Sequence, residues 1–288
     1  MNEDPLKTYP VIGPDRRTEG DGWYTSIPED PKDITGGYLF KLEYMTRKGK
    51  EDNAYVTRRG QLIRFIDPDR LSQSEYSYIT TLLSSFEDAI FAEDGIDPST
   101  GKSYTELCDL TSFALKYLLE ETVENYDADH NSQYMYKDRD ADDPLIHAGP
   151  AWDYDAAYGS YATEKNVQPR EATGFWVNAQ NDEHAFWWPA LYRHADFQEK
   201  ATELWRERML PALRVLLGDA EDPSGQLLSI DAYAAKIKKA ALMDSTRWAG
   251  LNDYSGIAET GSTWRQNVNF LKRFLRERTE WLMTQWGE

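Results

Sequence analysis

Two short segments of the chain carry oxygen-bearing side chains at spacings that could support chemistry. "NYDADHN" places Asp127 and Asn131 four residues apart, and "GPAWDYDAAYG" places Asp153 and Asp155 among aromatic residues. Carboxylates are rarely set among aromatic side chains unless a positive charge is held there. Carboxylate and amide oxygens are also the ligands that Mg²⁺ and similar cations prefer. The two segments therefore predict a site for a divalent cation.

The residues between these segments indicate how the two could meet. "SQYMYKD" and "PLIHAG" are typical of two short strands joined by the turn "DRDADD". A hairpin of this kind is expected to bring both segments to one cleft. Phosphoryl transfer needs a carboxylate that orients the attacking hydroxyl and oxygen ligands that hold Mg²⁺ against the phosphates. The turn itself is interpreted as a solvated acidic surface, because aspartate side chains cap local N–H groups in turns.

The remaining pattern predicts strands in front and helices behind. Residues 1–35 are rich in Pro, Gly and charge, and are expected to be irregular. Residues 36–44 and 54–66 are typical of strands, the second region turning at Arg59-Gly60. Ser72 and Glu75 predict a capping box at the start of a helix. Further helices are expected from about Asp109, over 196–217 with a kink at Pro211, over 230–243 and over 263–283, with a long loop after Gly159. The chain is therefore α+β, with a small β-rich front part, a central β-hairpin and a mainly helical C-terminal lobe.

Composition excludes several classes of function. The 288 residues include 32 basic and 50 acidic ones, a net charge of −18, which argues against a nucleic-acid surface and favours cations or basic polypeptides as partners. The single cysteine, Cys108, excludes an internal disulfide. No apolar run approaches the roughly 18 residues of a membrane span. The start, "MNEDPLKTYP", lacks the basic-then-apolar order of a secretory signal.

The chain resembles the spore coat protein H (CotH) kinases, a family of atypical protein kinases. The resemblance covers roughly residues 36–284 and is most specific over 112–159. It is carried by "GGYLFKLEY", "LTSFALKYLLEETVENYD", "HNSQYMYKD", "WDYDAAYG", "RW" (Arg247 and Trp248) and "FLKRFLRERTEWL". It implies an atypical-kinase fold that binds ATP with Mg²⁺ or Mn²⁺ and phosphorylates protein hydroxyls, chiefly serine.

The same resemblance implies roles for individual residues. Asp127 would orient the substrate hydroxyl, while Asn131 and Asp153 would hold the metal, with Asp155 as an additional ligand or a group behind it. Glu43 would lie where the first strand runs into the hinge, beside the nucleotide base. From the residues alone, Glu43 could equally be an ordinary strand-end carboxylate.

The family's nucleotide-gripping loop and its lysine-bearing strand are expected upstream of "GGYLF", where only about 35 residues stand and no Gly-x-Gly-x-x-Gly occurs. We therefore expect an irregular segment, 1–35, followed by a kinase-like domain, 36–284, that lacks this grip and transfers phosphate poorly. The resemblance implies an extracellular, cell-surface or spore-coat location. The protein substrate is expected to be basic and rich in serine.

Two other functions remain open. The first is a non-catalytic pseudokinase scaffold or a structural protein of a coat or surface. The second is a calcium-stabilised binding module, because Asp127, Asp129, Asn131 and Asp138 stand at positions 1, 3, 5 and 12 of an EF-hand-like loop. Against it, position 6 is Ser132 where a sharp turn favours Gly, and "QYMYK" is typical of a strand.

The last helix carries one charge on its apolar face. Arg278 falls on the stripe of Trp264, Val268, Leu271, Leu275 and Leu282. An unpaired buried guanidinium is strongly destabilising. We therefore expect Arg278 to be buried and paired with a carboxylate from the helix over 109–124 or the helix over 196–217.

Overall fold

The computed structural model describes residues 29–48, 53–128, 131–160, 171–179, 187–248 and 263–288. The chain divides into two compact units. The first is drawn from residues up to Lys116, from Asp127–Trp152 and from Asn178–Gln198. The second contains Tyr117–Tyr126, Asp153–Val177 and Glu199–Glu288. The part of the N-terminal segment that is described, 29–35, contains no helix or strand, as the sequence predicts.

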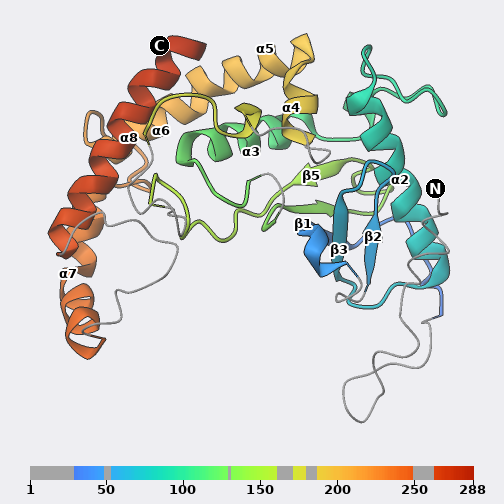
Figure 1. Cartoon of the computed structure of the whole chain (residues 1–288), viewed down its shortest axis with the longest axis horizontal. Coiled ribbons are helices and arrows are strands. Elements are labelled where there is room, and N and C mark those ends of the chain that lie inside the picture. Colours follow the sequence, from blue (N-terminus) through green and yellow to red (C-terminus); the bar gives the residue numbers. More distant parts are fainter. Residues whose placement is uncertain (1–28, 49–52, 129–130, 161–170, 180–186, 249–262) are drawn as a thin grey trace. The chain divides into compact units, whose positions relative to one another are not determined.

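One antiparallel sheet forms the centre of the first unit (Figure 1). Its order is β2-β3-β1-β4-β5. The strands are β1 (Tyr38–Glu43), β2 (Ala54–Val56), β3 (Leu62–Asp67), β4 (Tyr134–Lys137) and β5 (Ile146–Ala148). The predicted front strands and central hairpin are confirmed, and the fold class is α+β. The hairpin is not separate, however, because β4 pairs with β1 and extends the front sheet.

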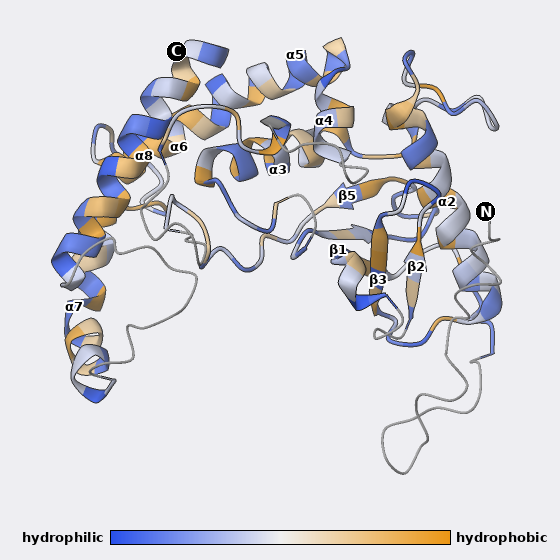
Figure 2. Cartoon of the chain, in the orientation of Figure 1, coloured by the Kyte–Doolittle hydropathy of each residue, from blue (hydrophilic) through white to orange (hydrophobic). Residues whose placement is uncertain are grey.

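The sheet buries one side of β1. Tyr38, Phe40 and Leu42 alternate along this strand and are almost fully buried. Figure 2 shows β3, the neighbour of β1, in the hydrophobic colour along much of its length. Lys41 lies on the opposite face of β1 and pairs with Tyr134 of β4. This register brings the start of β4 beside the end of β1, since Leu42 N donates to Gln133 O at 3.0 Å.

Helices complete the first unit and supply aromatic packing. They are α2 (Gln73–Phe91), the first part of α3 (Leu110–Val123), α4 (Trp187–Tyr192) and the short 3₁₀ helices Met45–Arg47, Tyr104–Glu106 and Val177–Ala179. The capping box of Ser72 and Glu75 is confirmed. The ring of Phe86 lies 5.3 Å from that of Phe113 and 5.1 Å from that of Trp187.

Helix α4 lies where a long loop was expected. Its six residues make fewer than two turns, so no helical period is visible in the sequence. Trp187 and Trp188 are almost fully buried, and α4 packs against α2. Tertiary packing of these aromatic side chains therefore stabilises a helix that local periodicity could not predict.

The second unit is mainly helical. Its helices are α5 (Ala195–Leu204), which begins in the first unit, a π-helical turn (Trp205–Met209), α6 (Leu210–Leu217), α7 (Ile230–Arg247) and α8 (Trp264–Trp286). Both α6 and α7 pack against α8. Figure 2 shows hydrophilic and hydrophobic colours alternating along α8, as expected for an amphipathic helix.

The helical region predicted over 196–217 is present and is irregular beside Pro211. The irregularity is the π-helical turn just before it, and Pro211 itself lies in the first turn of α6. A proline at that place loses no hydrogen bond, while its ring disturbs the carbonyl of the preceding turn. The π-helical turn absorbs this disturbance without breaking the helix. Helix α7 also continues four residues beyond the predicted end.

The expectation for Arg278 is confirmed within the second unit. Its side chain is fully buried, with Nη2 3.0 Å from Glu121 Oε2 and Nη1 3.1 Å from Glu124 Oε1. Its Nε and Nη2 also donate to Glu121 O, at 2.9 and 2.6 Å. Arg278 thus ties α8 to the end of α3 through charge-assisted hydrogen bonds. Among the helices of the described ranges, none is both long and apolar enough to cross a membrane.

Candidate functional site

The end of β1 carries an ion pair. Lys41 and Glu43 are two residues apart, so they lie on the same face of the strand. Lys41 Nζ is 2.9 Å from Glu43 Oε2, and Arg47 Nε is 3.8 Å from Glu43 Oε1. Glu43 is only 3% exposed, and its Oε1 also accepts from Tyr44 N at 3.0 Å. A buried carboxylate at the predicted position is therefore neutralised by a mostly buried lysine.

The turn after α3 holds the expected acid and amide together. Asn131 N donates to Asp127 O at 3.1 Å, and Asn131 Nδ2 donates to Asp127 Oδ2 at 2.9 Å. Ser132 Oγ donates to the same Oδ2 at 3.0 Å. Backbone and side-chain hydrogen bonds therefore fix the direction of the Asp127 carboxylate. Asp129 and His130, between them, lie outside the described residues.

Two hydrogen bonds join this turn to β1. Lys41 Nζ donates to Asn131 Oδ1 at 3.2 Å, and Tyr44 Oη donates to Asp127 Oδ1 at 2.7 Å. Both contacts follow from the pairing of β1 with β4, which begins just after Ser132. The first unit thus contains one continuous polar cluster: Glu43, Lys41, Asn131, Asp127 and Tyr44. We call it the β1–turn cluster.

Helix α4 supports this turn from behind. Trp188 Nε1 donates to Ala128 O at 2.7 Å, and the Trp188 ring lies 6.1 Å from that of Phe113 in α3. Trp188 is almost fully buried. The residue next to Asp127 is therefore anchored to the core by a rigid aromatic side chain.

The second carboxylate pair belongs to the second unit. Asp153 and Asp155 are exposed, while Tyr154 between them is turned inward and partly buried. Tyr154 Oη donates to Glu120 Oε1 at 2.6 Å. Burial raises the pKa of Tyr154, and the charge of Glu120 raises it further, so the phenol stays protonated and remains a donor. The Tyr154 hydrogen bond thus holds the segment that carries the two exposed aspartates.

Backbone contacts dock this segment on α3. Tyr126 N donates to Ala156 O at 3.0 Å, and Tyr158 N donates to Val123 O. Asp153 and Tyr158 have left-handed backbone angles, with φ of 66° and 58°. Such angles cost free energy in residues other than glycine, and they gather at functional sites. Glu124 and Ser132 share this conformation, so four of the five such residues in the described ranges lie between 124 and 158.

The predicted site residues therefore divide into two groups. Glu43, Asp127 and Asn131 come together in the first unit, in the β1–turn cluster. Asp153 and Asp155 lie two residues apart on one exposed segment of the second unit, and their approach to Asp127 stays a prediction. Within the described ranges, no three His, Cys, Asp or Glu side chains are placed to hold a metal ion. The donor chemistry still fits Mg²⁺ or Mn²⁺, because carboxylate oxygens are present in both groups and the first group adds the amide oxygen of Asn131.

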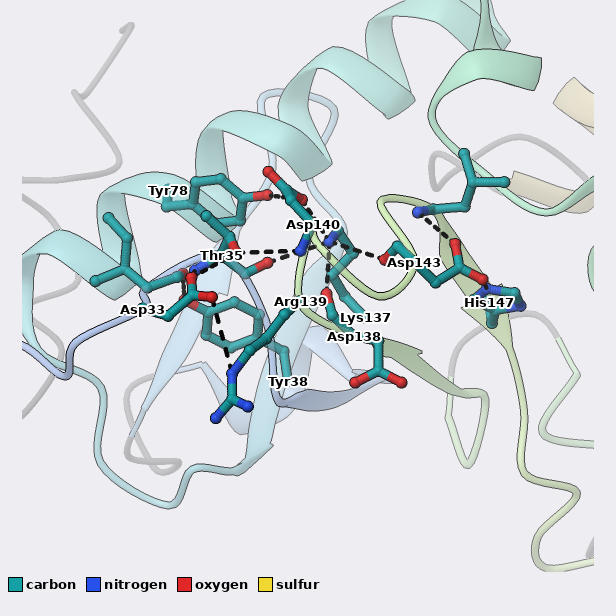
Figure 3. A network of polar contacts seen from close by, with 12 residues as sticks. Asp33, Thr35, Tyr38, Tyr78, Lys137, Asp138, Arg139, Asp140, Asp143 and His147 are labelled. Atoms are coloured by element: carbon teal, nitrogen blue, oxygen red, sulfur yellow. Dashed lines mark hydrogen bonds and ion pairs between the residues drawn. The ribbon is translucent and has the colours of Figure 1, made fainter.

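The acidic turn after β4 does more than face solvent (Figure 3). Lys137 is fully buried, and its Nζ donates to four oxygens: Asp140 Oδ1 at 2.7 Å, Asp138 O at 2.6 Å, Thr35 O at 3.1 Å and Asp143 O at 3.3 Å. The turn is exposed, as its interpretation as a solvated acidic surface expects, and it also covers a buried lysine. It encloses an ammonium ion, which neutralises part of its charge.

The calcium-loop alternative receives no support from this geometry. The stretch that would begin an exit helix is strand β4. Asp138, expected at the twelfth loop position, directs its carbonyl oxygen at Lys137. An EF-hand needs helices on both sides of its loop. The segment is instead a strand and a turn of the central hairpin.

Two residues of the cluster were missed by sequence reasoning. Lys41 is the polar residue of an alternating strand, "YLFKLE", and a lysine on the half-exposed face of that strand was the available signal. Tyr44 had no distinguishing signal, because its contact with Asp127 spans 83 residues of sequence. Both depend on the register of β1 against β4, which local patterns do not determine.

Protein kinases also combine an ion-paired lysine with an aspartate and an asparagine of the catalytic loop, although there the lysine and the glutamate come from different elements. Residues 29–282 match the family model described as CotH kinase protein. This match covers most of the chain, which therefore belongs to the CotH kinase family. No match to a curated protein was found. Membership defines the chain as kinase-like and confirms the resemblance seen in its motifs.

Proposed function

We propose that this chain is a metal- and ATP-dependent protein kinase that phosphorylates serine hydroxyls. The observation that carries the proposal is the position of Lys41, whose Nζ lies 2.9 Å from buried Glu43 and 3.2 Å from Asn131. In protein kinases a lysine held by a glutamate contacts the nucleotide phosphates, and an asparagine of the catalytic turn binds a metal ion. Family membership supports the same reaction class.

In this proposal Lys41 binds the nucleotide phosphates, a role that the resemblance assigns to a lysine upstream of residue 36. Its ammonium group is held by Glu43 on one side, and its side chain is only 13% exposed. A lysine fixed in this way has lost its rotamer freedom before the nucleotide arrives, so little entropy is lost on binding. Glu43 then acts through Lys41, as a positioning residue, while the phosphate oxygens contact the ammonium group.

Asp127 orients the acceptor hydroxyl and receives its proton. Hydrogen bonds from Tyr44, Asn131 and Ser132 hold its carboxylate in one direction. Asn131, Asp153 and Asp155 would hold the divalent ion, which neutralises charge on the phosphates when bound. For Asn131 this requires that its Oδ1 exchange the Lys41 ammonium for the metal.

The net charge supports a basic substrate. With 50 acidic against 32 basic residues, the chain attracts cationic, serine-rich polypeptides and repels nucleic acid. A place at a cell surface or spore coat, outside the cell, follows from the family alone and is part of this proposal.

Calorimetric titration with Mn²⁺-ATP tests the role of Lys41. We expect Lys41→Met to lower the affinity about ten- to a hundredfold, the equivalent of one charge-assisted hydrogen bond. Affinity for Mn²⁺ alone should not fall, because the variant frees the Asn131 Oδ1 from the lysine. Lys102→Met, which alters an exposed lysine of the same unit, is the matched control. Equal Mn²⁺-ATP affinity in wild type and Lys41→Met would contradict the proposal, provided that thermal melts show both proteins folded.

The same titration separates the kinase from a non-catalytic relative. Tight Mn²⁺-ATP binding without transfer of phosphate to a basic serine peptide would assign the chain as a pseudokinase scaffold. Asp153→Asn should weaken the binding of Mn²⁺ alone, because it removes a charged oxygen ligand. Unchanged Mn²⁺ binding in that variant would show that Asp153 is not a ligand.

A further inference from the structure

The carboxylate of Asp127 already binds a hydroxyl of the chain itself. Tyr44 directly follows β1 and precedes the 3₁₀ helix Met45–Arg47. Its Oη donates to Asp127 Oδ1 at 2.7 Å. The other oxygen, Oδ2, accepts from Asn131 Nδ2 at 2.9 Å and Ser132 Oγ at 3.0 Å. Asp127 Oδ2 thus accepts hydrogen bonds from residues of its own turn, and Asp127 Oδ1 accepts one from the phenol of Tyr44, just after β1.

In a kinase, the hydroxyl that lies next to the catalytic aspartate is placed to accept phosphate. A group that is to give up its proton to a base must lie within about 2.6–3.2 Å of that base. Tyr44 Oη meets this requirement at 2.7 Å. Ser132 also meets it, but its side chain is buried and its backbone is held at a φ of 53°. Tyr44 is only partly buried as a residue, whereas Ser132 is almost fully buried.

The phosphate-binding group lies beside the same hydroxyl. Lys41 stands three residues before Tyr44 and reaches Asn131 Oδ1 at 3.2 Å. Asn131 in turn donates to Asp127. Only two hydrogen bonds therefore separate the ammonium of Lys41 from the carboxylate that holds Tyr44. A terminal phosphate held by Lys41 would lie near the phenol as well as near Asp127.

We propose that Tyr44 occupies the acceptor position of Asp127 and is the site of intramolecular phosphorylation. The proposal rests on the proposed kinase function and adds to it a modification site and a second acceptor class, a phenol within the chain. In the step, a lone pair of Tyr44 Oη forms the bond to the γ-phosphorus of ATP. The bond from that phosphorus to the bridging oxygen breaks, and its electron pair leaves with ADP. The phenolic proton passes to Asp127, which later releases it to water.

The test is site-resolved mass spectrometry of the whole chain after incubation with Mn²⁺-ATP and a basic serine peptide. We expect phosphate on Tyr44 at a first-order rate that does not change with protein concentration, because the reaction is intramolecular. Tyr136 and Tyr233, which are 40% and 41% exposed, should stay unmodified. Tyr44→Phe and Asp127→Asn should each yield no phosphotyrosine, with thermal melts showing that both are folded.

Three results would overturn the proposal, and they differ in whether they also contradict the proposed kinase function. Phosphate on the peptide with Tyr44 unmodified would show that Tyr44 only orients Asp127, and the kinase function would stand. Phosphate on Tyr136 or Tyr233, or a rate proportional to protein concentration, would show transfer between molecules governed by exposure. Phosphate on neither peptide nor Tyr44 would remove the proposed function together with the proposal.

Discussion

At the scale of single residues, the β1–turn cluster shows charges that neutralise one another inside the first unit. Glu43 is almost fully buried, and a carboxylate in that position is tolerated because Lys41 and Arg47 lie against it. Lys137 and Arg278 are buried charges of the same kind. Lys137 donates hydrogen bonds to surrounding oxygens, and Arg278 forms ion pairs with Glu121 and Glu124. Each buried charge can therefore be tested by removing one partner.

Arg278 provides the clearest test of this logic. Arg278→Leu leaves Glu121 and Glu124 buried without their cation, so the free energy of unfolding should fall by about 3–5 kcal/mol. Arg276 lies on the same helix and pairs with Asp219 at the surface, with both side chains more than 40% exposed. Arg276→Leu should therefore cost only about 0–1 kcal/mol. Urea denaturation measures both, and equal losses would show that burial of the pair is not what matters.

Asp140 predicts a dependence of stability on pH. Partial burial raises the pKa of Asp140, but hydrogen bonds from Lys137 and Tyr78 lower it more, so its pKa lies below the ordinary value. A carboxylate whose pKa is lowered by folding stabilises the folded state at pH values above its unfolded-state pKa of about 3.9. This stabilisation is lost as the pH falls through its folded-state pKa. Asp140→Asn should therefore be less stable than wild type at pH 7 and equally stable at low pH.

The size of that difference is limited by solvent. The Asp140 carboxylate is 47% exposed, so screening reduces the loss at pH 7 to about 1 kcal/mol or less. Urea denaturation at a series of pH values measures it, with Asp138→Asn, at an exposed position of the same turn, as the control. A stability difference that stays constant from pH 7 to below the folded pKa would contradict this account of Lys137 and Asp140.

At the scale of elements, α3 is the support of the second carboxylate pair. Glu120 of α3 accepts the Tyr154 hydroxyl, and backbone hydrogen bonds from Tyr126 and Tyr158 fix the same segment. Tyr154→Phe removes the hydroxyl and releases the residue between Asp153 and Asp155. Loss of such a supporting contact commonly weakens metal binding by about tenfold or more.

We therefore expect Tyr154→Phe to bind Mn²⁺ about tenfold more weakly in calorimetric titration. Tyr136→Phe removes a hydroxyl from an exposed tyrosine of β4 and should leave the Mn²⁺ affinity unchanged. The two variants together distinguish support of the carboxylates from a general effect of losing a phenol. Equal Mn²⁺ affinity in Tyr154→Phe and wild type would mean that the backbone contacts alone hold Asp153 and Asp155.

Elements with a strong local pattern could be predicted from the sequence. The capping box of Ser72 and the apolar period that follows it define α2, and alternation defines β1. Helix α4 could not be predicted, because packing of its aromatic side chains against distant residues stabilises it. The π-helical turn before Pro211 could not be predicted either, because a proline in a helix does not by itself indicate which irregularity will form. Boundaries were off by up to four residues where helices continue without a breaking residue, as at the end of α7.

The candidate site was predictable only in part, for a physical reason. Asp127 and Asn131 are close in sequence, so their spacing already placed them on one turn. Lys41 and Tyr44 join them only because β1 pairs with β4 in one register, and a shift by one residue would turn Lys41 to the core. Sequence spacing was thus enough to predict that Asp127 and Asn131 lie together. The addition of Lys41 and Tyr44 depends on strand pairing.

At the scale of the whole molecule, two compact units each carry one group of oxygen ligands. The first holds Asp127 and Asn131 with Lys41, and the second holds Asp153 and Asp155. Family membership covers both units, since the match extends over residues 29–282. We expect a variant in either group to reduce the transfer of phosphate.

One measurement tests the central claim most directly: incorporation of labelled γ-phosphate from Mn²⁺-ATP into a basic, serine-rich peptide by the wild type and by Asp127→Asn. Asparagine keeps the shape of the side chain but cannot accept the hydroxyl proton, and a general base of this kind contributes about 10²–10⁴-fold to the rate. The account predicts Mn²⁺-dependent incorporation by the wild type and a loss of at least a hundredfold in the variant, with the melting temperature retained. Equal incorporation by the two proteins would contradict it.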